Sequence, residues 1–178
     1  MKLLVNFKVL RWLMLVALLL PVSSVLMAQQ KADSPEINKV MNQARDHATL
    51  AYDDSADLVT YVRSHTSWES CSRCLQRIKD HAGDLIKDYT RLQELRPEGS
   101  PWQQESIDRL DPQLRSMANN LDGMITHLNK FQAESYMPTM REFADKNLKL
   151  MTDARKTVCD CVDYGKAKAT VEKGIYKE

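Results

Sequence analysis

The spacing of the apolar residues constrains this 178-residue chain more than any other feature. Over four long stretches, apolar side chains recur at every third or fourth position, and the second stretch shows the pattern without a break. Its apolar positions are Trp68, Cys71, Leu75, Ile78, Ala82, Leu85, Tyr89 and Leu92. Residues three and four apart lie on one face of an α-helix, so each stretch predicts an amphipathic helix with one buried face.

Serine and proline mark the beginnings of these stretches. Ser34 precedes Pro35 and Ser100 precedes Pro101; serine caps a helix, and proline fits its first position. The segment Thr66–Glu69 has the spacing of a capping box, in which two side chains bind each other's backbone N–H groups. Together with the apolar pattern, these signals predict helices over residues 35–64, 67–95, 101–133 and 138–164, with a charged tail over 166–178.

Two residues inside the helical stretches are poor helix formers. Pro112 lacks a backbone N–H, so we expect it to kink the third helix or to move its start to about Asp111. Gly165 is expected to loosen the fourth helix before the charged tail.

The connections between the four predicted helices are only a few residues long. Short connections make successive helices antiparallel neighbours, which predicts an all-α, up-down-up-down four-helix bundle over residues 34–165. The regular alternation of three and four also predicts coiled-coil-like packing. The alternative is an extended two-hairpin coiled coil that dimerises.

The first 28 residues have the features of a secretory signal peptide. Lys2, Lys8 and Arg11 precede an apolar run that Pro21 ends, and small residues then lead to Ala28. We expect cleavage after Ala28, a polar leader over 29–33, and a periplasmic or extracellular protein. The alternative is that the segment stays as an anchor. No later segment resembles a membrane span.

Charge excludes one class of partner. Removal of the signal takes away three basic residues and leaves 22 basic against 24 acidic residues. A slightly acidic bundle lacks the basic face that nucleic acid binding requires.

Four cysteines occur in two close pairs, Cys71 with Cys74 and Cys159 with Cys161. In the predicted topology these pairs lie near opposite ends of the bundle, beyond the ~7 Å between Cα atoms that a disulfide allows. A local Cys71–Cys74 bond, bonds between chains and free thiols stay open. Cys71 and Cys161 fall on buried positions, whereas Cys74 and Cys159 flank them and are expected to be partly exposed. A redox-sensitive dimer linked through Cys74 or Cys159 is therefore one hypothesis.

Two histidines are candidates for a metal or haem site. His47 and His81 lie near the middle of two antiparallel helices, and bundles hold such cofactors between facing side chains. No histidine has the glutamate three residues earlier that di-iron bundles use. The acidic segment Asp53–Asp57 is expected to be a solvated face. No recognised catalytic motif occurs, so we expect no enzyme and assign no cofactor.

Four segments together resemble a group of uncharacterised exported bacterial helical proteins. The segments are SWESCSRCLQRIKDHAGDL, SPWQQESIDRLDPQL, ITHLNK and CVDYGKAK. The recurring positions of that pattern are Trp68, His81, Trp102, Asp108, Arg109, His127 and Asn129. The resemblance implies a four-helix bundle and export, and it implies no activity. The cysteines depart from the pattern, so no cysteine chemistry is carried over.

The sequence therefore predicts an exported, non-catalytic helical bundle that works as an interaction module or an envelope-associated structural module. Its partner would be a protein or another component of the envelope, and the chain could form a homodimer. A periplasmic bundle that binds metal or haem is the alternative, together with the thiol-linked dimer.

Overall fold

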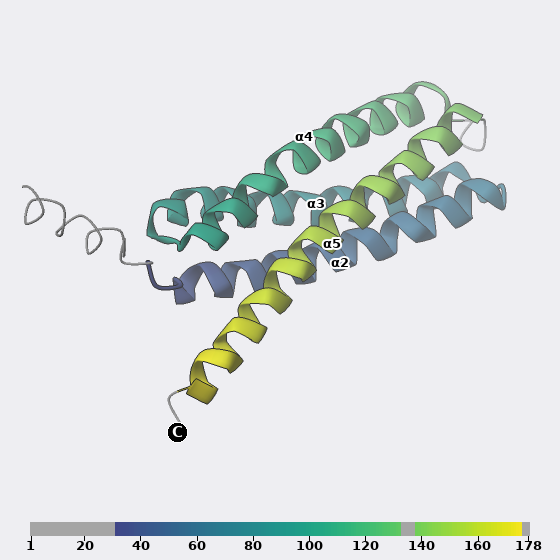
Figure 1. Ribbon diagram of the computed structural model, residues 1–178. Coiled ribbons are helices and arrows are strands. Elements are labelled where there is room, and N and C mark those ends of the chain that lie inside the picture. Colours follow the sequence, from purple (N-terminus) through teal and green to yellow (C-terminus); the bar gives the residue numbers. More distant parts are fainter. Residues whose placement is uncertain (1–30, 133–137, 176–178) are drawn as a thin grey trace, which may run out of the picture. The chain divides into compact units, whose positions relative to one another are not determined.

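Four long α-helices make up the computed structural model, which describes residues 31–132 and 138–175 (Figure 1). They are α2 (Pro35–Arg63), α3 (Trp68–Leu95), α4 (Pro101–Lys130) and α5 (Pro138–Ile175), and one short 3₁₀ turn, η1 (Arg96–Glu98), follows α3. The predicted all-α class is confirmed. The predicted signal peptide, residues 1–28, lies outside the described residues.

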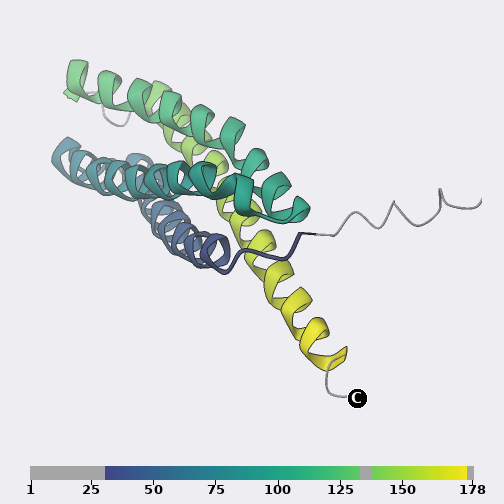
Figure 2. The same ribbon diagram turned by 90° about the vertical axis from the view of Figure 1, so that its left-hand side faces the viewer.

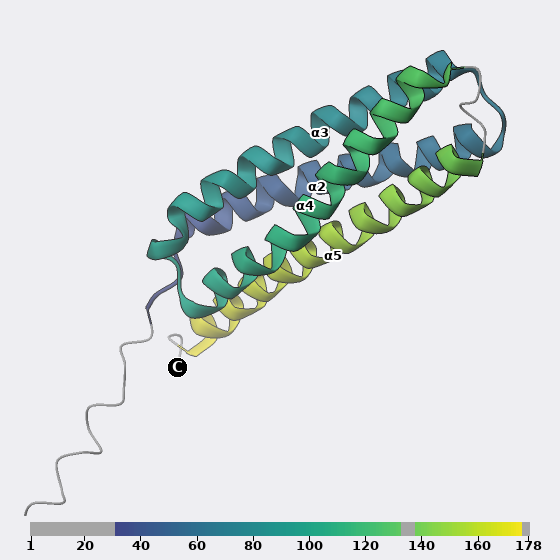
Figure 3. The same cartoon turned by 90° about the horizontal axis from the view of Figure 1, so that it is seen from above.

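Successive helices run in opposite directions, as Figure 3 shows. α2 packs against α3 on one side and α5 on the other, α5 also packs against α4, and the contact between α3 and α4 is the least extensive. Ion pairs mark both ends of the α2–α5 contact: Arg63 with Asp145 at one end, and Asp33 with Lys168 at the other. This arrangement is the predicted up-down-up-down four-helix bundle.

The core follows the predicted apolar faces and runs along all four helices. α2 contributes small side chains at its centre, namely Ala44, Ala48, Ala51 and Ser55, all fully buried. α3 and α4 contribute large ones, such as Leu85 and Met117. Small residues let backbones approach, so the side chains themselves explain why α2 lies closer to its neighbours than α3 lies to α4.

The helix starts agree with the predicted caps except at α3. Ser34 caps α2 with Pro35 in the first turn, and Ser100 caps α4 in a capping box with Gln103. The cap of α3 is Ser67, whose side chain accepts from the backbone N–H of Ser70. The predicted Thr66–Glu69 box is thus wrong by one residue. Two adjacent hydroxyl residues, Thr66 and Ser67, precede this helix, and the second of them is the cap.

One of the two alternatives predicted for Pro112 is wrong. α4 begins at Pro101 and continues through Pro112, so its start is not moved to Asp111, and the kink at Pro112 stays a prediction. The capping box at Ser100 fixes the beginning of that helix before the internal proline is reached.

α5 does not end at residue 164 but continues through Gly165 to Ile175, so most of the predicted charged tail is helical. Lys168, in this added part, forms ion pairs with Asp33 and with Glu172 one turn later. The last turns of α5 extend past the beginning of α2 (Figure 2). Within the described ranges, no helix has an apolar stretch long enough to cross a membrane.

Candidate functional site

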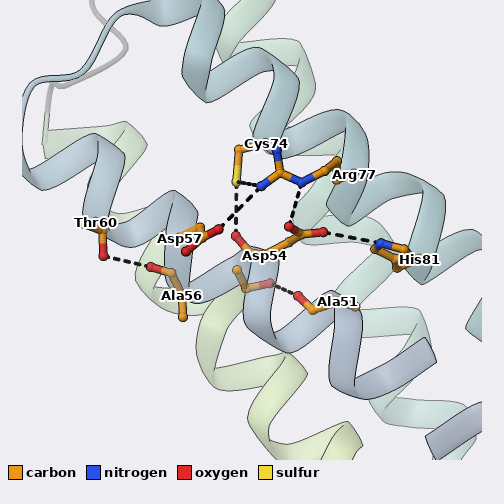
Figure 4. Close-up of polar contacts among 9 residues, drawn as sticks. Ala51, Asp54, Ala56, Asp57, Thr60, Cys74, Arg77 and His81 are labelled. Carbon is orange, nitrogen blue, oxygen red and sulfur yellow. Dashed lines mark hydrogen bonds and ion pairs between the residues drawn. The ribbon is translucent and has the colours of Figure 1, made fainter. Parts of the chain in front are cut away.

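A row of polar side chains lies between α2 and α3 and centres on Asp54 (Figure 4). Arg77 Nε donates to Asp54 Oδ1 at 2.7 Å, and His81 Nε2 lies 3.5 Å from Asp54 Oδ2. Arg77 Nη2 also lies 3.5 Å from Asp57 Oδ2. The Asp54 side chain is only 13% exposed. The expectation that the acidic segment is wholly solvated is therefore wrong for Asp54, because α2 turns this residue toward Arg77 and His81 of α3.

Cys74 belongs to the same row and is fully buried, although the sequence led us to expect partial exposure. Its thiol donates to the backbone carbonyl of Asp54 at 3.1 Å, because α2 lies directly over it. Burial raises the pKa of the Cys74 thiol to about 12, against a smaller opposing effect of Arg77. A thiol with a raised pKa is protonated at neutral pH and is a poor nucleophile.

The other three cysteines take different positions. Cys71 and Cys161 are buried core residues, as predicted, and Cys159 is half-buried. All four are free thiols. Cys74 lies against Asp54 of α2, whereas Cys161 lines a cavity together with Met41 of α2. Asp54 and Met41 are separated by roughly 20 Å along the helix, at 1.5 Å per residue. The two cysteine pairs thus occupy separate parts of the bundle.

His47 and His81 both lie at the α2–α3 boundary, but each contacts its own carboxylate. His47 Nδ1 is 2.7 Å from Asp88 Oδ2, and His81 contacts Asp54. Among the described residues, no three His, Cys, Asp or Glu side chains converge in a way that could hold a metal ion. The metal or haem site stays a prediction.

A second polar cluster joins the beginning of α2 to the beginning of α4 through the buried side chain of Gln103. Gln103 Oε1 accepts from the backbone N–H of Ser34 at 2.9 Å and from that of Ser100 at 3.0 Å. Gln103 Nε2 donates to the carbonyl of Ser34 at 3.0 Å and to Asn38 Oδ1 at 2.9 Å. One amide therefore satisfies backbone groups at two helix starts that are 66 residues apart in sequence.

Trp102, the neighbour of Gln103, is held in place from several sides. Its Nε1 donates to Asp33 Oδ1 at 2.7 Å, and Asp33 Oδ2 pairs with Lys168 Nζ at 2.8 Å. Its ring meets that of Tyr164 edge-on, with centroids 5.0 Å apart. A Cβ atom at Gly165 would lie 3.1 Å from the indole, so the absence of a side chain there lets Trp102 lie close to α5. The indole has little freedom to move.

Two hollows flank Trp102. The larger, of about 410 Å³, lies between α4 and α5. Its lining residues are Trp102, Glu105, Ser106, Arg109, Thr157, Asp160, Cys161 and Tyr164. The smaller, of about 160 Å³, lies toward α2 and shares Trp102 and Cys161 with the first. The indole therefore forms part of the wall between them. We call the larger hollow the Trp102 cavity.

The remaining positions of the recurring pattern do not join this cavity. Asp108 accepts two hydrogen bonds from Arg96, each of 2.7 Å, and fixes η1 to α4. His127 packs near Phe143, and Asn129 is exposed near the end of α4. Trp68 packs against the core at the start of α3. Of the positions selected from the sequence, Trp102, Arg109 and Cys161 are the ones that the Trp102 cavity brings together.

Sequence reasoning missed Asp33, Gln103 and Tyr164 as members of this end of the bundle. Gln103 and Tyr164 occur in the segments SPWQQESIDRLDPQL and CVDYGKAK, but the sequence pattern assigns neither residue a role. A sequence signal that could have linked Gln103 to Tyr164 is the position of their motifs. SPWQ lies at the start of one predicted helix, and VDYGK lies toward the end of the next. In an antiparallel pair those positions are level with each other.

Comparisons with protein-family models, with curated proteins and with solved structures found no match for this chain.

Proposed function

We propose that this chain is an exported, non-catalytic helical bundle that works as a binding module, with the Trp102 cavity as its binding surface. The observation that supports this is the fixed orientation of Trp102 beside an open cavity of about 410 Å³. Binding sites combine apolar and aromatic walls with a few placed polar groups, in cavities of roughly 300–1,000 Å³. An indole held by its own hydrogen bond contributes a recognition surface at little cost in conformational entropy.

Site-specific photo-crosslinking in the exporting cell tests the binding surface. Benzoylphenylalanine replaces Tyr164, which is 53% exposed at the cavity, and in a matched control it replaces Leu50, which is 45% exposed on α2. We expect a discrete adduct from position 164 and not from position 50. No adduct at 164, or the same adduct from both positions, would contradict the proposal.

Export and the lack of catalysis are tested on the same protein. Mass spectrometry of the chain recovered outside the cytoplasm should find an N-terminus near Gln29. Recovery in the cytoplasm with Met1 retained would contradict export. A purified sample that turned over a substrate, or that carried a stoichiometric metal or haem, would contradict a non-catalytic binding module.

A further inference from the structure

We propose that the Trp102 cavity binds an organic cation, an alkylammonium or guanidinium group carried on a short apolar stem. This inference rests on the proposed binding function and specifies its ligand. It is drawn from three properties of the cavity wall. These are its aromatic rings, its balance of charges, and the hydrogen bonds that already bind backbone N–H groups at the start of α4.

The aromatic rings come first. Trp102 and Tyr164 both line the cavity, and their rings meet edge to face at an interplanar angle of 65°. The faces of such rings carry negative charge density, and they attract ammonium and guanidinium groups, tryptophan most strongly. This protein already uses the same contact elsewhere, since the Arg155 guanidinium lies 4.0 Å from the centre of the Tyr52 ring.

The charges of the wall favour the same sign of ligand. Two carboxylates, those of Glu105 and Asp160, and one guanidinium, that of Arg109, line the cavity. Glu105 pairs with Arg109, and Asp160 pairs with Lys156, which lines a different hollow. Both carboxylates are about two-thirds exposed, at 65% and 64%. Ion pairs this exposed contribute little stability, so an incoming cation can compete for the carboxylates.

The start of α4 does not supply an anion site to offset these charges. A helix start attracts anions through its free backbone N–H groups. Here Pro101 has none, and the N–H of Gln103 is bound by the Ser100 side chain in the capping box. The N–H of Gln104 donates to the Ser100 carbonyl at 3.0 Å. The backbone N–H groups of Gln103 and Gln104 are therefore in use.

The test is a titration of the ¹⁵N-labelled exported protein, followed through the indole N–H signals of its tryptophans. The probes are butylammonium, the peptide acetyl-Gly-Arg-Gly-amide, and butyrate as an anion of matched size. We expect both cations to move the Trp102 signal saturably, while the Trp68 signal, from the start of α3, stays in place as an internal control. A peptide that binds more tightly than butylammonium would identify the source as a partner's side chain, and equal affinities would identify a free amine.

Paired variants test the role of the carboxylates. Glu105→Gln combined with Asp160→Asn should weaken binding of both cations at least about fivefold. Asp122→Asn combined with Glu142→Gln removes the same charge from exposed positions of α4 and α5 away from the cavity, and should leave binding unchanged. Unfolding midpoints of both double variants show that the fold is retained.

Three results would overturn the inference: butyrate moving the Trp102 signal in place of the cations, no probe moving it, or both double variants weakening binding equally. The photo-crosslinking at position 164 keeps this failure separate from that of the proposed function. An adduct at 164 without cation binding would leave the binding module intact and reject only the cation.

Discussion

Single residues in this bundle differ in reactivity because of what covers them. Cys71, Cys74 and Cys161 are buried, and burial raises the pKa of each of these three thiols. Cys159 is only half-buried. Alkylating reagents react with the thiolate form of an accessible cysteine.

We therefore expect iodoacetamide to modify the native protein once, at Cys159, and all four cysteines after unfolding. Mass spectrometry of peptides from native and denatured samples measures this. Rapid native labelling of Cys74 would show that α2 does not cover it. A Cys159→Ser variant should remove the single native adduct, and it also removes the one cysteine that is accessible for a link between chains.

Gln103 forms buried hydrogen bonds with residues that are far from it in the sequence. Its amide is fully buried and satisfies Ser34, Asn38 and Ser100. Replacement by leucine keeps the volume but leaves buried backbone groups without partners, each costing about 1–3 kcal/mol. We expect Gln103→Leu to lower the free energy of unfolding by about 3 kcal/mol, measured by urea titration.

The neighbouring Gln104 is the matched control. Its amide donates to the Gly99 carbonyl at 2.9 Å in a part-buried position. Gln104→Leu should cost less than about 1 kcal/mol, because water can replace the lost bond. Equal losses from the two variants would mean that the network around Gln103 does not hold the helix starts together.

At the scale of the elements, the apolar pattern predicted the four helices, because three-and-four spacing is a local property of each segment. The helix caps at Ser34 and Ser100 could be predicted for the same reason, because a cap depends on a few neighbouring residues. The burial of Cys74 and the inward turn of Asp54 could not be predicted, since they depend on how far α2 and α3 are rotated toward each other. That rotation is set by packing, which no single segment encodes.

Gly165 shows how a correct local rule gave a wrong element boundary. Glycine weakens a helix, so α5 was expected to end there. In the structure the indole of Trp102 lies against Gly165, and a Cβ atom at this position would be in unusually tight contact with it. Packing of Trp102 and the ion pair of Lys168 with Asp33 add stability that the isolated helix lacks. The Trp102 cavity was unpredicted for the same reason: its walls come from two helices.

Two other glycines allow the helix and packing effects to be separated. A Cβ at Gly83 in α3 would meet no atom within 4 Å, whereas one at Gly123 in α4 would lie 2.9 Å from Phe143 Cε1. Gly83→Ala should raise the melting temperature by roughly 3 °C, because alanine favours the helix by about 1 kcal/mol. Gly123→Ala should lower it, because the Phe143 ring must shift. Calorimetry of both variants measures the difference, and an equal rise would show that Phe143 yields freely.

At the scale of the whole molecule, one carboxylate contacts several helices at one end of the bundle. Asp33 precedes α2 and accepts from Trp102 of α4, while Lys168 of α5 pairs with it, so it connects three helices. Burial alone would raise the pKa of Asp33, but the hydrogen bonds from Lys168, Ser100 and Trp102 outweigh it and hold the pKa below its ordinary value of 3.8. The charged form of Asp33 is therefore favoured in the folded state.

The pH dependence of stability follows from that direction. A carboxylate with a lowered folded pKa contributes its full stability above its ordinary pKa, and the contribution is lost as the pH falls through the lowered value. We expect Asp33→Asn to be less stable than the unchanged protein by about 1 kcal/mol at pH 6, and the difference to shrink steadily below about pH 4. Urea unfolding between pH 6 and pH 2.5 measures both curves. Asp53→Asn, at an exposed position of α2, should run parallel to the unchanged protein over the whole range. If the Asp33→Asn curve instead stays parallel down to the lowest pH, the charge of Asp33 does not hold this end together, and Trp102 must owe its position to Gly165 and Tyr164 alone.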